Sequence, residues 1–170
     1  NQALPLVQST KGRTREARTL QNIGGVHEKL GHPDEAIAAY EQARVVFKDA
    51  GDREGEAIVL SNLGRLYTEQ QRLDEAEPLF QQADTIAKDT QNDHASAIVL
   101  INWADLYTQR GDFAQAELML NEALIIARRV GNPVTEAKAL VNQGKLAAAQ
   151  GDNSTARTLL QKGLTKAQIM

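Results

Sequence analysis

The sequence contains no cysteine and few aromatic residues. The lack of cysteine excludes disulfides, thiol nucleophiles and cysteine-ligated metals, and it favours, without requiring, the cytoplasmic location that we predict. Aromatic residues make up only 4% of the chain, which argues against the stacking platforms that hold single-stranded nucleic acids.

Long apolar runs and an excess of positive charge are absent too. No apolar stretch approaches the roughly 20 residues that span a bilayer, and no signal peptide is visible. The net charge is −3, whereas proteins that bind nucleic acids or anionic membranes usually carry a basic patch. We therefore expect neither a nucleic acid nor a membrane as a partner.

Motifs that carry chemistry are missing as well. The chain has three histidines, His27, His32 and His94, and their spacing fits neither a zinc pair on one helical face nor a catalytic group. The sequence lacks G-x-x-x-x-G-K-[ST], G-x-G-x-x-G and G-x-S-x-G. We expect a protein that is not an enzyme and that needs no cofactor or metal.

What the chain does contain is a repeat with a period of 40 residues. Asparagine recurs at this spacing at Asn22, Asn62, Asn102 and Asn142. Leucine and alanine columns keep the same register. We assign the repeats to 12–51, 52–91, 92–131 and 132–170, with 1–11 as the second half of a preceding repeat. A native N-terminus with a half-repeat cap is the alternative.

Each repeat reads as two helices. We expect N-caps for the first helices at Gly12, Asp52, Asn92 and Asn132. We expect turns at Gly31, Gly111 and Gly151, with Gln71 as the exception, and caps for the second helices at Asp34, Asp74 and Ser154. Small residues such as Gly64 allow the two helices to approach closely. Neither helix can bury its apolar face alone, so neighbouring repeats must stack.

The pattern Leu60-x-x-Leu63-Gly64-x-x-Tyr67, followed by Ala76 and Phe80, resembles the tetratricopeptide repeat (TPR). The usual TPR period is about 34 residues. The longer period here is similar to that of spindle-orientation adaptor and kinesin light chain repeats, and to TPR arrays of bacterial multidomain signalling proteins. The resemblance implies an all-α, right-handed superhelical solenoid of antiparallel helix pairs over residues 1–170. It also implies that the first helices line a concave groove.

The asparagine column faces away from the expected hairpin core. On a helical wheel Asn62 falls about 200° from Leu60. An asparagine amide offers two donors and an acceptor, so it can bracket a peptide bond of an extended ligand. The candidate peptide-binding residues on this stripe are Asn22, Ile58, Asn62, Arg65, Ile98, Ile101, Asn102, Asp105, Lys138, Asn142 and Lys145.

Two interpretations of this stripe stay open. The asparagines can contact a peptide, or they can bond to a neighbouring helix or to water, and Ile58 and Ile98 can serve inter-repeat packing. Arg65 and Lys145 flank Asp105, so the charge is mixed and argues against a dedicated carboxylate site.

We predict a protein-interaction module that binds an extended peptide segment of a partner or of its own parent chain. The alternative is a structural spacer or a self-association segment with contacts through the array ends, where Leu4, Leu6 and Val7 leave an apolar surface. The last repeat carries departures that indicate either a polar C-terminal cap or drift: Gln143, Asn153, Arg157 and Gly163.

Overall fold

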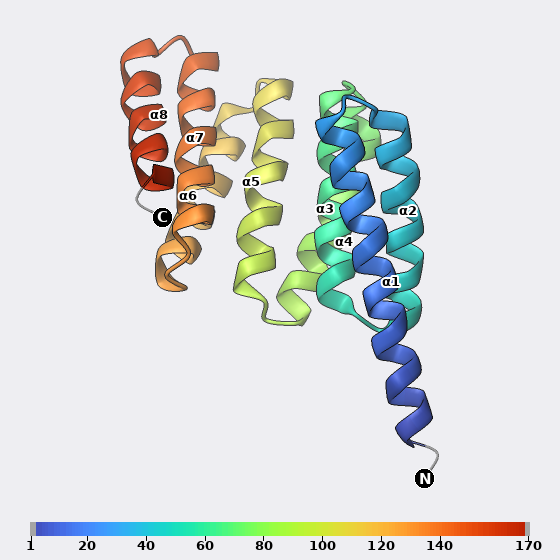
Figure 1. Cartoon of the computed structure of the whole chain (residues 1–170). Helices are drawn as coiled ribbons and strands as arrows, with labels where there is room; N and C mark the ends of the chain where they lie inside the picture. The colour runs from blue at the N-terminus through green and yellow to red at the C-terminus, as the bar shows by residue number, and fades with distance from the viewer. Residues whose placement is uncertain (1–2, 169–170) are drawn as a thin grey trace.

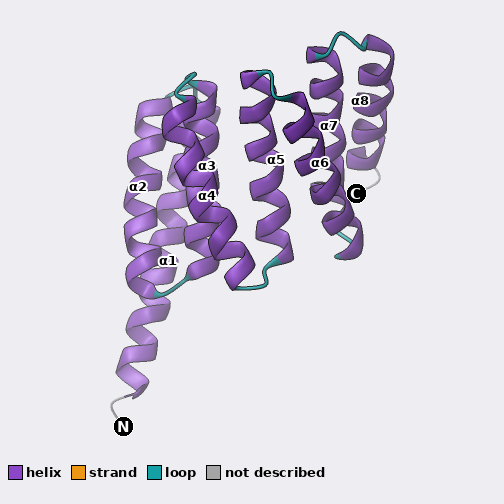
Figure 2. Ribbon diagram, turned by 180° about the vertical axis from the view of Figure 1, so that it is seen from behind, coloured by secondary structure: helices purple, strands orange, loops and turns teal. Residues whose placement is uncertain are grey.

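The computed structural model describes residues 3–168 of the chain, with side chains from residue 10 onward. This part consists of eight helices joined by short turns. Figure 1 shows them stacked in chain order, and Figure 2 shows the short connections from the opposite side. The helices are α1 (Ala3–Lys29), α2 (Pro33–Ala50), α3 (Arg53–Glu69), α4 (Leu73–Asp89), α5 (Asp93–Arg110), α6 (Phe113–Arg129), α7 (Pro133–Ala149) and α8 (Asn153–Gln168).

The helix boundaries repeat every 40 residues, because α3, α5 and α7 begin at Arg53, Asp93 and Pro133. The even-numbered helices begin at residues 33, 73, 113 and 153, at the same interval of 40. The all-α repeat fold expected from the sequence is confirmed. The assignment of the chain to individual repeats, with a half-repeat at 1–11, stays a prediction.

The first helix of each pair starts at a side-chain cap, as predicted, except for α1. The Asp52 carboxylate accepts a hydrogen bond from the Gly55 amide at 2.9 Å, and Asn92 and Asn132 do the same for α5 and α7. The cap predicted at Gly12 is wrong, because this residue lies inside α1. Glycine offers no capping side chain, and Lys11 occupies the position at which Gly51 makes a left-handed turn.

The caps predicted for the even-numbered helices are also wrong. These helices begin earlier than expected, so Asp34, Asp74 and Ser154 lie within the first turn. The cap of α6 is Asp112, which accepts a hydrogen bond from the Gln115 amide at 3.2 Å. An acidic residue in the first turn still stabilises the helix, because it faces the positive end of the helix dipole.

The turns inside the helix pairs need a residue in the left-handed backbone region. Gly31, Gly111 and Gly151 have φ values of 74°, 80° and 84°. Gln71 holds the equivalent position with φ of 62°, although a side chain makes this conformation less favourable. The turn geometry is therefore kept even where the glycine is missing.

The two helices of a pair approach each other at small residues. A Cβ atom added to Gly64 would lie 2.8 Å from the Phe80 ring, and one added to Gly24 would lie 2.7 Å from the Tyr40 ring. Larger residues around these points form the buried core, which gathers into two main clusters. One cluster belongs mostly to α1–α4 and the other to α5–α7, and a small third cluster contains Phe80 and Leu106.

The stack curves with the odd-numbered helices on the inside. Helix α3 contacts both α1 and α5, and α5 also contacts α7. Within residues 3–168, no even-numbered helix contacts another even-numbered helix. Elements on the inner side of a curved stack lie closer together than those on the outer side. The predicted stripe on the first helices therefore lies on the concave surface.

Candidate functional site

A groove of about 380 Å³ lies on the concave surface and is lined by residues of α1, α2, α3, α5 and α7. It contains seven of the residues that the sequence singled out, and these come from three different helices. The seven are Asn62, Arg65, Ile98, Ile101, Asn102, Lys138 and Asn142. The 40-residue register therefore brings residues from separate repeats together on one surface.

Four predicted residues lie outside this groove: Asn22, Ile58, Asp105 and Lys145. Asn22 and Lys145 are exposed to solvent, and Ile58 is half-buried. The half-buried Asp105 accepts a hydrogen bond from Gln109 at 3.0 Å, within the same helix.

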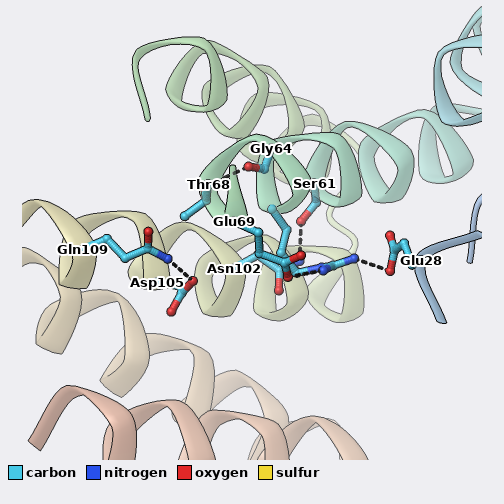
Figure 3. A network of polar contacts seen from close by, with 9 residues as sticks. Glu28, Ser61, Gly64, Thr68, Glu69, Asn102, Asp105 and Gln109 are labelled. Carbon is cyan, nitrogen blue, oxygen red and sulfur yellow. Dashed lines mark hydrogen bonds and ion pairs between the residues drawn. The ribbon is translucent and has the colours of Figure 1, made fainter. Parts of the chain in front are cut away.

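Asn102 has a partner in the neighbouring helix. Its Nδ2 donates to the Ser61 hydroxyl at 2.9 Å and so links α5 to α3 (Figure 3). The Ser61 side chain is fully buried, and a buried hydroxyl requires a hydrogen-bond partner. This contact supports a structural role for Asn102, one of the two interpretations left open by the sequence.

The other asparagines of the column differ from Asn102. Asn142 donates to the Lys138 carbonyl of its own helix at 2.9 Å. Neither Asn22 nor Asn62 has a side-chain hydrogen bond to any residue in the described part of the chain. Asn62 is half-buried and lines the groove, so its amide is the one that is both inside the groove and free.

Arg65 forms the ionic part of the groove. Its guanidinium contacts the Glu28 carboxylate of α1 and the Glu69 carboxylate one turn further along α3, each at 2.5 Å. Figure 3 shows Glu28 and Glu69, the two acidic residues whose carboxylates contact this guanidinium. Burial lowers the pKa of Arg65, but the two carboxylates outweigh it and the net shift is upward. Arg65 therefore stays charged and ties α1 to α3.

Two groove residues, Glu28 and Tyr40, were missed from the sequence. Burial, together with the Glu28 carboxylate beside it, raises the pKa of Tyr40 above its usual value, so the phenol stays protonated at neutral pH. Glu28 stands at the repeat position of the buried Thr68. A charged residue at a buried position was a signal that could have identified it.

A second hollow continues the groove toward the turn after α1. It measures about 550 Å³ and shares Glu28 and Arg65 with the first. Its other lining residues include Pro33, Leu66 and Gln70. The ion pair of Glu28 and Arg65 therefore lies where the two hollows adjoin.

The two positively charged groove residues, Arg65 and Lys138, differ in whether they have an acidic partner. Arg65 is neutralised by two carboxylates, whereas Lys138 is exposed and has no acidic partner within residues 10–168. Lys138 lies in the same groove as the half-buried Ile98. Ile101 also borders the groove, but it is only 3% exposed and belongs to the core. The groove thus presents one free cation beside an apolar surface.

None of the helices in the described part of the chain is long and apolar enough to cross a membrane.

Comparison with known proteins identifies the repeat type. The model of the MalT-like TPR region matches residues 1–168. The fold is similar to the crystal structure of BtubC (BKLC) from P. vanneervenii, with a TM-score of 0.69 and 20% sequence identity. That alignment covers 91% of this chain and 64% of BtubC, so the chain spans less than two thirds of the length of that structure. None of the curated proteins matches the chain.

Proposed function

The chain belongs to the family of MalT-like TPR regions, and we propose that it binds an extended segment of a protein partner, or of its own parent chain, in the groove lined by α3, α5 and α7. Repeat solenoids present extended concave surfaces of this kind for binding. The proposed role is that of a non-catalytic interaction module. The cytoplasmic location predicted from the lack of cysteine belongs to the same proposal.

The free amide of Asn62 is the observation that carries this proposal. Asn62 is half-buried in the groove, and within residues 10–168 its side chain has no hydrogen-bond partner. A peptide backbone satisfies such an amide on both its donor and its acceptor side. Because the contact is to the backbone, it holds a segment without reading its side chains.

The neighbouring residues define which segment fits. Ile98, which is half-buried, offers an apolar surface for one side chain of the ligand, whereas Ile101 is only 3% exposed and belongs to the core. Lys138 lacks an acidic partner within residues 10–168 and would pair with an acidic side chain nearby. We therefore propose a ligand in which an apolar residue and an acidic residue follow each other in extended conformation. The net charge of −3 fits a protein partner better than a nucleic acid or an anionic membrane.

The test begins with a pull-down by this chain and mapping of the bound peptide. That peptide is then titrated against the wild type, Asn62→Ala and Asn22→Ala by calorimetry. Loss of the amide contacts in Asn62→Ala should weaken binding about 5- to 10-fold, the value of about one hydrogen bond. Asn22→Ala is the matched control, since it removes the same amide outside the groove and should bind as the wild type does.

Equal affinity of the wild type and the folded Asn62→Ala variant would contradict the proposal. The alternative role as a structural spacer would then gain support. Circular dichroism establishes that each variant keeps its helices before affinities are compared.

A further inference from the structure

The outer surface of α6 carries two aliphatic side chains, Leu118 and Ile125, which are each 65% exposed. They lie seven residues apart, which is about two helical turns, so they share one side of the helix. Described helices precede and follow α6 in the stack, so this surface lies within the array. The side chains of Leu4, Leu6 and Val7, which the sequence suggested for an apolar end, lie outside the part of the chain whose side chains are described.

Ile125 borders a groove of about 450 Å³ that is lined by residues of α4, α5 and α6. Helices α4 and α6 belong to the outer side of the stack, and within residues 3–168 no contact joins them. Helix α5 lies between them, and its buried Leu100 is one of the lining residues. We call this space the outer groove, because it opens away from the concave surface.

The charged residues of the outer groove leave one carboxylate without a partner. Arg129 pairs with Asp93 at 2.7 Å, and Lys88 pairs with Asp84 at 2.6 Å. Glu122 lines the groove and is exposed, and among residues 10–168 no basic side chain forms a salt bridge with it. The hydrogen bond to Asp84 raises the pKa of Lys88, and the charge of Glu122 adds to this shift. Two carboxylates therefore share one ammonium group, and the outer groove carries a net negative charge.

The grooves at the same repeat position on either side lack this combination. Between α2 and α4, the residues in place of the glutamate and the isoleucine are Gln82 and Thr85. Between α6 and α8, they are Lys162 and Thr165. An exposed aliphatic side chain beside an unpaired carboxylate is therefore particular to the outer groove between α4 and α6.

Glu122 lies four residues after Leu118 and three before Ile125, so the carboxylate and the two aliphatic side chains share one face of α6. The carboxylate attracts a cation, and the aliphatic side chains favour an apolar surface next to it. An amphipathic helix offers both at this spacing and fits a groove between two helices.

We propose that the outer groove binds an amphipathic helix of a protein partner, with aliphatic residues against Leu118 and Ile125 and a lysine or arginine beside Glu122. This contact is separate from the concave groove, whose unpaired charge, Lys138, has the opposite sign. The two surfaces therefore select different segments.

Fluorescence anisotropy with two labelled peptides tests the proposal. One peptide is an amphipathic helix of leucine and lysine, and the other keeps the leucine pattern with glutamate in place of lysine. The lysine peptide should bind the wild type about 10-fold more tightly than the glutamate peptide, because like charges oppose each other at the outer groove. This difference should shrink at high salt.

Two substitutions give the outer groove the residues of its neighbour between α2 and α4. Ile125→Thr should weaken binding of the lysine peptide about 5-fold, because less apolar surface is buried. Glu122→Gln should weaken it about 3- to 5-fold and reduce its dependence on salt, because the unpaired charge is lost. Circular dichroism establishes that both variants keep their helices.

Three control variants should bind the lysine peptide as the wild type does. Val45→Thr makes a similar change on α2, at the repeat position of Ile125, where Val45 is 54% exposed. Glu35→Gln removes one exposed negative charge from α2 and so controls for net charge. Asn62→Ala changes the concave groove alone, so it separates this proposal from the proposed function.

Failure of the lysine peptide to bind the wild type, or binding no tighter than that of the glutamate peptide, would overturn the proposal. Wild-type affinity in both the Ile125→Thr and the Glu122→Gln variants would place the peptide elsewhere on the surface. An equal loss in Val45→Thr and Ile125→Thr would indicate adsorption to exposed aliphatic residues in general, which also contradicts the proposal.

Discussion

The contacts of α3 with its two inner neighbours differ in chemistry although they share one repeat register. Toward α1, Arg65 reaches Glu28 and the link is ionic. Toward α5, Ser61 accepts from Asn102 and the link is neutral, with the Phe80–Trp103 stack beside it. The backbone repeats, while the polar groups that join neighbouring repeats are particular to each junction.

The largest expected effect comes from removing the aromatic contact at the α4–α5 junction. Phe80→Ala should lower the free energy of unfolding by about 3–5 kcal/mol, because it empties a fully buried site. Urea denaturation followed by the fluorescence of Trp103, the single tryptophan, measures this loss. The exposed Leu118→Ala should change stability very little, and an equal loss in both variants would contradict the packing account.

Breaking the ionic link should cost less. Arg65→Met leaves Glu28 unpaired at 20% side-chain exposure, and we expect a loss of about 1–2 kcal/mol, below that of a fully buried pair. The loss should shrink at high salt, because ions stabilise the freed carboxylate. Urea denaturation at low and high salt checks this, and a loss that does not depend on salt would indicate packing rather than charge.

Breaking the neutral link provides the matched comparison. Ser61→Ala removes the hydroxyl that accepts from Asn102 and should cost about 1 kcal/mol. Salt should leave this value unchanged, since no net charge is involved. If Ser61→Ala and Arg65→Met respond to salt alike, the proposed difference between the two contacts is wrong.

The smallest expected effect concerns the free energy of unfolding at alkaline pH, which depends on Tyr40 beside Glu28 of α1. Burial and Glu28 raise the folded-state pKa of Tyr40 above its ordinary value of 10.0. The stability that comes from this shift is complete below pH 10 and is lost as the pH rises further. Tyr40→Phe has no ionisable hydroxyl, so its unfolding free energy should fall less steeply than that of the wild type above this pH.

Much of the fold could be predicted from the period of the sequence. The columns at Gly64 and Phe80 specified where helices approach, because a small residue must face a large one. The caps at Asp34 and Asp74 were misplaced, because an acidic residue in the first turn and one at the N-cap give the same sequence signal. Gly12 was misread because a repeat position does not guarantee a break in the helix.

The candidate site was predicted less completely, because its chemistry depends on which side chains of neighbouring repeats contact each other. Asn102 lies against Ser61, but the residues at the Ser61 position of the adjacent repeats are Gln21 and Ile101. The asparagine at this repeat position therefore has a partner in the neighbouring helix in one repeat and none in another. Glu28 escaped notice because its partner, Arg65, lies in the next repeat.

The central claim is that Asn62, and not Asn102, is the groove amide left free for a ligand. It is tested most directly by NMR of the side-chain amides of labelled protein during titration with the mapped peptide. We predict that the Asn62 amide signals shift and saturate together with binding, while those of Asn102 keep the positions set by Ser61. Saturated binding with unchanged Asn62 signals would contradict the account.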